Sequence, residues 1–297
     1  MALYAFDGTG NEDKEGTEHD SNVLLFFQGY DDPSKNDDTK IDRGSLYLKG
    51  IGTRADDDPA AKGVAEAFGI GGLARIGDGL KRLENNLNGG DSVIDIVGFS
   101  RGAALAIDFA NKIAEKFKDA SVRFIGVWDI VADFGLPGMH IAHSLSFPPN
   151  SKQCFHAMAL DEHRASFQLT RLAKEGEKPP GLLEVWFRGV HSDVGGGNGN
   201  MSLNWIALDW MYANAQRASL PIQDSAIALN LARRKDPPTV DHKFEVGTLR
   251  HIRETDLLHS SVQLDKGNIL FPHNNPKFEI ARIDNHGKIT GAASAAT

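Results

Sequence analysis

The sequence predicts an α/β fold, in which a mostly parallel central sheet carries helices on both faces. The clearest evidence is the succession strand, helix, strand in "SVIDIVGFS", "RGAALAIDFANKIAEKF" and "VRFIGVWDIV" between residues 92 and 131. Both strand segments are almost continuously apolar, as expected for strands that are covered on two faces. The chain has 297 residues, 41% of them hydrophobic, which is enough for one large domain with a deep core.

The other segments fit this architecture when they are taken in order. "ALYAF" at residues 2–6 predicts a first strand, and "SNVLLFFQGY" predicts a helix capped by Ser21 or Asn22. "SLYLKGIGT" predicts a second strand, "GLLEVWFRGV" a later one, and "LNWIALDWMYANAQRA" an amphipathic helix. "GIGGLARIGDGLKRLENNL" predicts a helix that ends at Asn88-Gly89-Gly90 and carries one apolar stripe, made of Leu73, Ile76, Leu80, Leu83 and Leu87.

We expect a single domain over residues 1–290. The proline-rich block 135–181 has short patterns and predicts an insertion that caps the sheet edge. "NILFPHNNPKFEIARI" predicts a terminal strand or hairpin, and residues 291–297 are expected to form a disordered tail.

Composition excludes several functions. The net charge of −8 disfavours a nucleic-acid binder, which has to neutralise phosphates. A single cysteine, Cys154, rules out an internal disulfide, and its apolar surroundings predict a core residue. No apolar run is long enough to span a membrane, and no signal peptide is visible. We therefore expect a cytoplasmic protein, whose export would need a system that does not read a signal peptide.

The strongest chemical signal is "GFSRG", which runs from Gly98 to Gly102 between a predicted strand and a predicted helix. The pattern Gly-x-Ser-x-Gly in this context is typical of a nucleophile elbow, a strained turn that exposes a serine at the carboxyl edge of the sheet. The sequence therefore predicts Ser100 as a nucleophile, with Gly98 and Gly102 making room for the turn. The backbone N–H of Arg101 would then lie beside a developing oxyanion.

A serine nucleophile needs a base and an acid that orients the base. Asp129 ends the next predicted strand and would share the carboxyl edge with Ser100, while Asp133 is the rival. His191 follows the predicted strand "GLLEVWFRGV" and is the expected base, with His259 in "LLHSSVQ" as the competitor. The glycines at 195–197 predict a loose loop that folds toward the nucleophile, and Asp193 is expected to shape it.

The segment "FDGTGN" begins with Phe6, the last residue of the first predicted strand, and continues with the loop at residues 7–11. The N–H groups of Gly8 and Thr9 are candidates for the second oxyanion donor, and Asp7 is expected to hold this loop through backbone hydrogen bonds. The alternative is a metal-dependent phosphohydrolase centred on Asp7, although Ala5 stands where such enzymes carry their nucleophilic aspartate.

Two further patterns have weaker support. A divalent-metal site joining Asp7, His191 and Asp193 has no surrounding cluster of ligands. The glycine-rich segment at residues 69–74 matches a dinucleotide-binding pattern formally, but no strand precedes it, and it predicts the start of a helix.

The motifs together resemble a family of α/β-hydrolase domains that includes phospholipase effectors of type VI secretion systems. The resemblance rests on "FDGTGN", "GIGT", "GFSRGA", "VWDIV", "ALDEHRASF", "VWFRGVHSDVGGG" and "LNWIALDWM", which occur in the same order. The chain departs from the family in having His163-Arg164 where two arginines are common, and Asn198 where an aromatic residue is common.

This resemblance implies an α/β-hydrolase-like fold and a triad of Ser100, Asp129 and His191 that hydrolyses acyl esters, typically of glycerophospholipids. It implies no metal or other cofactor. The expected partners are an ester or phospholipid at a membrane surface and an immunity protein or a component of the secretion apparatus. A catalytically silent fold that acts as a binding module is the second alternative.

Overall fold

The computed structural model describes the chain except for residues 14–18, 38–42, 54–63, 133–144, 200, 235–239, 241–246, 265–273 and 292–297. Within the described residues, ten strands form one sheet in the order β10-β9-β8-β7-β6-β5-β4-β1-β3-β2. All neighbouring strands are parallel except β9 and β10, which form a terminal antiparallel pair. The strands are β1 (Ala2–Phe6), β2 (Asn36–Asp37), β3 (Leu46–Leu48), β4 (Ile94–Phe99), β5 (Val122–Trp128), β6 (Cys154–Ala159), β7 (Leu182–Phe187), β8 (Leu257–His259), β9 (Ala281–Ile283) and β10 (Ile289–Thr290).

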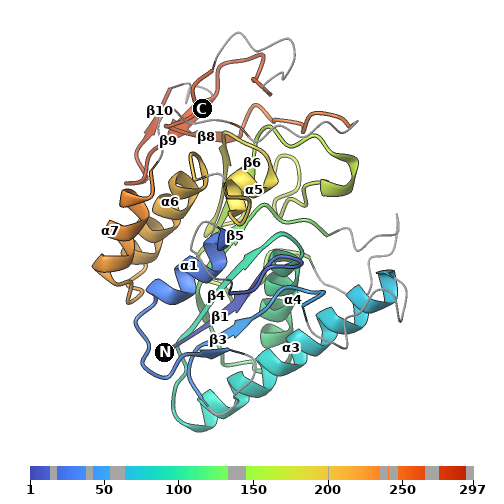
Figure 1. The fold of residues 1–297 in the computed structure, drawn as a ribbon, viewed down its shortest axis with the longest axis vertical. Coiled ribbons are helices and arrows are strands. Elements are labelled where there is room, and N and C mark those ends of the chain that lie inside the picture. Colours follow the sequence, from blue (N-terminus) through green and yellow to red (C-terminus); the bar gives the residue numbers. More distant parts are fainter. Residues whose placement is uncertain are drawn as a thin grey trace.

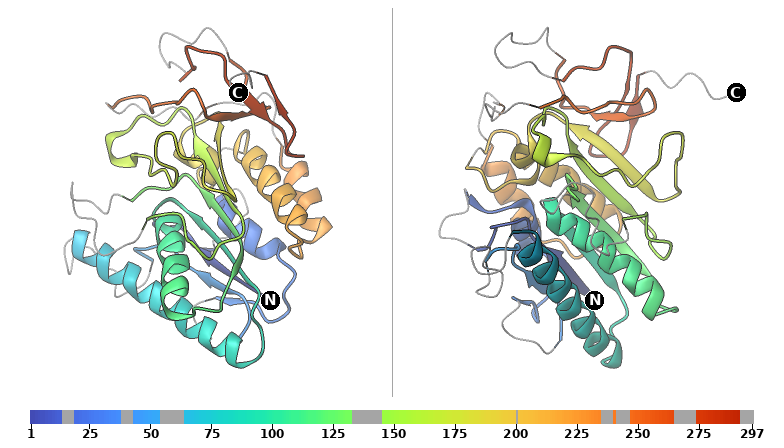
Figure 2. Two further views of the ribbon diagram at one scale, coloured as in Figure 1. Left: turned by 180° about the vertical axis from the view of Figure 1, so that it is seen from behind. Right: turned by 90° about the vertical axis from the view of Figure 1, so that its right-hand side faces the viewer.

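Helices cover both faces of the sheet, as Figures 1 and 2 show. α3 (Val64–Asn88) and α4 (Ser100–Lys116) pack on one face, in a core that includes Tyr4 and Phe6 of β1. α1 (Asn22–Gly29) and α6 (Asn204–Arg217) pack on the other face, in a core that includes Leu3 and Ala5, and α7 (Asp224–Ala232) packs on the outside of these two helices. Side chains of one strand thus alternate between the two cores, as expected for a sheet covered on both sides. The fold is the α/β architecture that the sequence predicts.

Several local expectations are confirmed in this fold. Ser21 caps α1, because its hydroxyl accepts a hydrogen bond from the backbone N–H of Leu24. α3 ends at Asn88, followed by Gly90 with a positive φ of 85°. Cys154 is a buried core residue, and β9, in the segment expected to form a strand or hairpin, pairs with β10.

Other expectations need correction. The glycine-rich segment at residues 69–74 lies inside α3 rather than at its start. Leu73 is 43% exposed, so the buried stripe of α3 runs through Ile76 and Leu83. β6 lies inside block 135–181, where the sequence predicts an insertion, and it pairs with both β5 and β7. Its short apolar run therefore belongs to the central sheet.

Candidate active site

The register of three central strands aligns the ends of β1, β4 and β5. Phe6, Gly98 and Val127 lie side by side in the sheet. The chain leaves β1 for β3 on one side, whereas β4 and β5 lie on the other side, so the strand order reverses between β1 and β4. Ligand sites of parallel sheets form at the carboxyl ends of strands beside such a reversal. Two residues beyond the aligned positions stand Gly8, Ser100 and Asp129, the predicted loop, nucleophile and acid.

Ser100 occupies a tight turn between β4 and α4. Its φ is 58°, in the left-handed region that residues with a side chain rarely adopt and that is found at strained functional sites. The flanking glycines permit the turn: a Cβ on Gly98 would lie 2.8 Å from Ala103 Cα, and one on Gly102 would lie 2.3 Å from the carbonyl oxygen of Asp7. The start of α4 therefore lies directly against the end of β1.

Asp129 is a second residue with a positive φ, 44°, and is fully buried. Its Oδ1 accepts a hydrogen bond of 2.8 Å from the backbone N–H of Ala159, at the end of β6. The guanidinium of Arg250 donates to both carboxylate oxygens, at 2.5 and 2.9 Å. Burial opposes ionisation of Asp129, but Arg250 and the hydrogen bond to His191 hold its pKa well below the usual range. Asp129 is therefore an anion.

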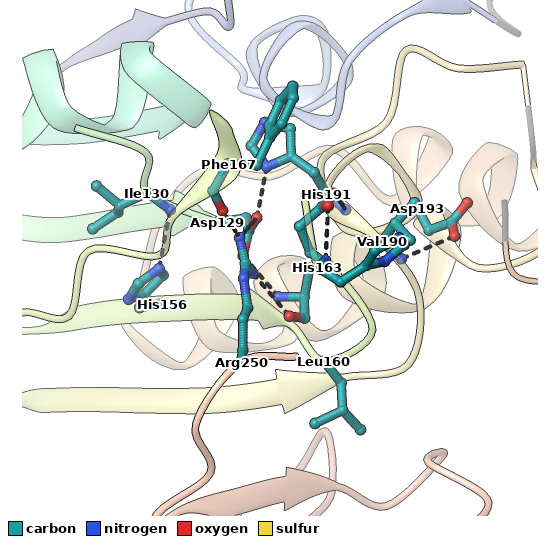
Figure 3. Close-up of polar contacts among 12 residues, drawn as sticks. Asp129, Ile130, His156, Leu160, His163, Phe167, Val190, His191, Asp193 and Arg250 are labelled. Atoms are coloured by element: carbon teal, nitrogen blue, oxygen red, sulfur yellow. Dashed lines mark hydrogen bonds and ion pairs between the residues drawn. The ribbon is translucent and has the colours of Figure 1, made fainter. Parts of the chain in front are cut away.

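His191 lies at the start of α5 (His191–Gly195), a short helix that follows β7. Its Nδ1 lies 2.6 Å from Asp129 Oδ2. Figure 3 shows the two side chains beside each other. An ionised carboxylate only accepts hydrogen bonds, so Nδ1 carries the proton and Nε2 of the neutral ring is left as an acceptor. The rings of Phe99 and Phe167 lie 4.6 and 4.8 Å from the imidazole. Burial lowers the pKa of His191, against the opposing effect of Asp129.

The glycines after His191 are explained by close contacts, not by a loose loop. A Cβ on Gly195 would lie 1.9 Å from the ring of Phe99, so only glycine lets α5 approach the residue before the nucleophile. Gly196 and Gly197 have φ values of 82° and 88°. Asp193 accepts hydrogen bonds from the backbone N–H of Val190 at 3.1 Å and from the amide of Asn198 at 3.1 Å. Asp193 therefore links the residue before α5 to the chain that follows α5.

Asp7 lies at the end of β1 and is buried among hydrogen-bond donors. They are the N–H of Gly8 at 2.6 Å, the hydroxyls of Ser21 and Tyr47 at 2.6 Å each, and the amide of Asn11 at 3.3 Å. Burial raises the pKa of Asp7, and these four donors oppose that rise. Because its N–H is bound to Asp7, Gly8 is the weaker of the two predicted oxyanion donors. The Thr9 hydroxyl is buried and has no hydrogen-bond partner among the described residues.

The structure does not bring Asp7, His191 and Asp193 together as metal ligands. In the described part of the chain, no three His, Cys, Asp or Glu side chains are grouped so that they could hold a metal ion. The carboxylates of Asp7 and Asp193 instead accept hydrogen bonds from their own loops.

The rival residues are placed differently. His259 stacks on Phe187, at 4.6 Å between ring centroids, and its two nitrogens contact Ser261 Oγ and Asn285 Oδ1, each at 2.7 Å. It therefore makes no contact with Asp129 or His191. Asp133 lies outside the described residues.

Sequence reasoning missed four residues around His191 and Asp129. Glu162 accepts a hydrogen bond of 3.1 Å from the backbone N–H of His191 and forms an ion pair with Arg164, which lies 3.8 Å above the ring of Phe167. Glu162, Arg164 and Phe167 all belong to "ALDEHRASF", a segment noted only for its resemblance to a family. Arg250 carried no local signal, because it is 121 residues from Asp129 along the chain.

Fold and site define a class of protein: the chain has an α/β-hydrolase-like fold with a serine at the elbow and a histidine–aspartate pair beside it. It belongs to a family within that class. The catalytic-domain profile of type VI secretion system (T6SS) Tle1-like phospholipase effectors matches residues 3–116 and 107–214, so the chain is a member of this family.

One solved structure shows the same fold, and two others have a lower similarity. An uncharacterized protein from Pseudomonas aeruginosa is similar with a TM-score of 0.53 and 23% identity, over 80% of this chain and 47% of that chain. The Tle1 effector bound to the VgrG spike of the type 6 secretion system has a TM-score of 0.47 and 23% identity, over 67% of this chain and 51% of that chain. TT1662 from Thermus thermophilus has a TM-score of 0.43 and 16% identity, over 73% of this chain and 88% of that chain. The chain spans about half the length of the first two.

Two other observations complete the comparison. No curated protein matches the chain. In the part of the chain that the structure describes, no helix has the combination of length and hydrophobicity that crossing a membrane requires.

Proposed function

We propose that this protein is a serine hydrolase that cleaves carboxylic acyl esters through Ser100, His191 and Asp129. The observation that carries the proposal is the buried contact of 2.6 Å between His191 Nδ1 and the Asp129 carboxylate, which also binds Arg250. It lies at a sheet edge where the neighbouring strand β4 is followed directly by Ser100 with a positive φ. A histidine that is fixed in this tautomer presents Nε2 as a base, which is what a serine nucleophile needs.

In the proposed mechanism, Ser100 Oγ attacks the acyl carbonyl and His191 Nε2 takes its proton. His191 then gives this proton to the leaving alcohol, and an acyl-enzyme forms. Water, deprotonated by His191, attacks the acyl-enzyme. His191 returns this proton to Ser100 Oγ as the bond between Oγ and the acyl carbon breaks, and the carboxylic acid leaves. Asp129 stays ionised throughout and stabilises the imidazolium. No step requires a metal ion.

The oxyanion is assigned to the backbone N–H of Arg101 and to the loop after β1. Within that loop Thr9 is the better donor, because the Gly8 N–H already binds Asp7. The Asp7 contacts with Ser21 and Tyr47 fix the start of this loop against α1 and β3, so that its donors are oriented before the reaction.

The proposed substrate is a glycerophospholipid at a membrane surface. This rests on the family description, which names phospholipase effectors. By the same argument we propose synthesis in the bacterial cytoplasm, export through a type VI secretion system, and partners in the secretion apparatus and an immunity protein. No observation favours an Asp7-centred phosphohydrolase, since the Asp7 oxygens are bound within the protein.

The test is labelling by a fluorophosphonate probe, which reacts with activated serines, followed by hydrolysis assays on phospholipid vesicles, triglycerides and short esters. Wild type and Ser121→Ala, a matched change at an exposed serine before β5, should label and hydrolyse alike. Ser100→Ala should do neither, and a chelator should change nothing. Labelling without any ester hydrolysis would reject the substrate class. Failure of the folded wild type to label would support the silent binding module, and activity that survives Ser100→Ala but not chelation would support the phosphohydrolase.

A further inference from the structure

Arg250 places a buried positive charge directly on the candidate catalytic acid. Its side chain is only 7% exposed. Besides both oxygens of Asp129, it binds the carbonyl oxygens of Ala159 at 2.8 Å and Phe167 at 2.7 Å. Figure 3 shows Arg250 next to Asp129. A guanidinium with two such donors fixes a carboxylate in one plane, which a single hydrogen bond does not do.

The chain delivers Arg250 to this place through a specific docking of residues 247–250. Gly247 forms an antiparallel bridge with Arg164, and a Cβ on Gly247 would lie 1.5 Å from the carbonyl oxygen of His163. The amide of Asn274 donates to the carbonyl oxygens of Arg250 and Leu160, at 2.9 and 3.0 Å. The segment is thereby joined to the same residues that surround His191. It lies beyond residues 3–214, the part that the family profile matches.

Three charged groups act on the protonation of His191, and a fourth nearby group, Arg164, is paired with Glu162. Asp129 favours the imidazolium through Nδ1, and Glu162 favours it from the backbone side. Arg250 opposes it, because the guanidinium shares the Asp129 carboxylate and repels a second positive charge. The other neighbours of the ring, Phe99 and Phe167, are uncharged.

We propose that Arg250 is a positioning residue for the hydrolase reaction: it orients the Asp129 carboxylate toward His191 and keeps His191 a neutral base at lower pH than Asp129 alone would allow. The inference rests on the proposed function for its catalytic meaning. Its physical content, an effect of Arg250 on the protonation of His191, holds independently of any substrate.

The experiment therefore measures both the reactivity of Ser100 and the protonation of His191. The rate of fluorophosphonate labelling is followed against pH, and the ring signals of His191, assigned with His191→Gln, are followed by NMR over the same range. In Arg250→Ala the acidic limb of the labelling profile and the titration of His191 should both move to higher pH. The labelling rate at its optimum should fall about 10- to 100-fold, as expected for a displaced base.

Rescue distinguishes this role from general stabilisation. Arg250 lines a cavity of about 380 Å³, which gives ethylguanidinium access to the space that Arg250→Ala leaves. Added ethylguanidinium should restore rate and titration toward wild type. The matched control is Arg253→Ala, which removes another arginine from this cavity, one that binds the carbonyl oxygen of Ala173 and not Asp129. It should leave both profiles unchanged.

Each outcome decides the inference. If Arg250→Ala folds and neither profile moves, Arg250 is not a positioning residue. If Arg250→Ala does not fold, Arg250→Lys, which keeps the charge and loses the two-donor geometry, should lower the labelling rate with a smaller movement of the profiles. A wild-type profile for Arg250→Lys would then overturn the proposal. If the wild type does not label, but the His191 titration differs between wild type and Arg250→Ala, the hydrolase proposal fails and the effect of Arg250 on His191 stands.

Discussion

At the scale of single residues, the candidate site depends on keeping one buried carboxylate ionised. Asp129 has no access to water, and burial alone would favour its neutral form. Arg250 and the N–H of Ala159 supply the compensation, so the remaining lone pairs of Asp129 are available to His191. The neighbouring histidine is therefore held in one tautomer by a partner that is itself held in one orientation.

The first prediction concerns pH. Burial lowers the pKa of His191 below the ordinary value of 6.5, and the base is active only when it is neutral. A lowered pKa means that the neutral form persists as pH falls, so the acidic limb of kcat/KM should lie below pH 6.5. Measurement of kcat/KM for a soluble ester between pH 4 and 9 checks this. A limb clearly above 6.5 would contradict it.

The second prediction concerns Asp129→Asn. An amide cannot accept from Arg250, Ala159 and His191 as the carboxylate does, and it releases His191 from the required tautomer. By comparison with other serine hydrolases, kcat should fall about 10⁴-fold. The measurement is kcat at saturating ester, with thermal unfolding as the control that the variant is folded. Activity within tenfold of wild type would exclude Asp129 as the acid.

Residues that directly follow strands could be predicted, because a parallel sheet collects its strand ends at one edge. Ser100, Asp129 and His191 were predicted in this way, and the structure brings His191 and Asp129 into contact. Arg250 could not be predicted, since it follows no strand and reaches Asp129 only through the docking of residues 247–250. Nothing in its local sequence indicates that docking.

At the scale of elements, the site depends on the close approach of α5 to the end of β4. Gly195 is the point of contact, packed on the face of Phe99. The same ring lies against His191, so Phe99 couples the position of α5 to that of the base. A glycine is required there because even one methyl group would have to displace the ring.

The third prediction follows from this contact. In Gly195→Ala the new Cβ, 1.9 Å from Phe99, should push α5 away from β4. We expect a loss of about 1–3 kcal/mol in stability, as for other overpacked cores, and a fall in kcat larger than any change in KM. The control is Gly77→Ala in α3, where a Cβ meets nothing within 4 Å. It should stabilise the protein by up to about 1 kcal/mol. Equal effects of the two changes would contradict the prediction.

Prediction of the elements succeeded where the pattern was long. β4, α4, β5, β7 and α6 have apolar runs or helical periodicity that identify them. β2, β8 and α5 have two, three and five residues, too few to show a period, and they form because neighbouring parts of the fold pair with them. α7 was missed because it lies on the outside of α1 and α6 with Leu229 and Leu231 exposed, so that its sequence shows no apolar stripe.

At the scale of the whole molecule, the outer half of the sheet is joined by buried charges rather than by apolar contacts alone. Glu184 of β7 binds His156 of β6 at 3.0 Å and Arg171 at 2.9 Å. Arg171 in turn binds Asp256, at 2.8 Å, just before β8. His156 also accepts a hydrogen bond of 3.2 Å from the N–H of Ile130, the residue after Asp129. One carboxylate thus links three strands to the chain segment that carries the candidate acid.

The fourth prediction is that Glu184 contributes to the free energy of unfolding at neutral pH and that this contribution is lost in acid. Burial opposes its ionisation, but His156 and Arg171 more than compensate and lower its pKa from 4.5 to about 2. Because the folded-state pKa is the lower one, this stabilisation is complete above pH 4.5 and is lost as pH falls through about 2. The shift corresponds to about 3 kcal/mol of the free energy of unfolding at neutral pH.

Glu184→Gln should therefore unfold at lower denaturant concentration at pH 7 than wild type, and its stability should depend less on pH between 4.5 and 2. Denaturant titrations at a series of pH values measure both. Glu254→Gln changes an exposed glutamate that lines the same cavity as Glu184, and its stability should match that of wild type at each pH. Asp129 and Glu162 also have lowered pKa values, so a residual pH dependence is expected in Glu184→Gln. An unchanged slope in this window would mean that the network carries no net stabilisation, and that the strands are held together by the apolar cores alone.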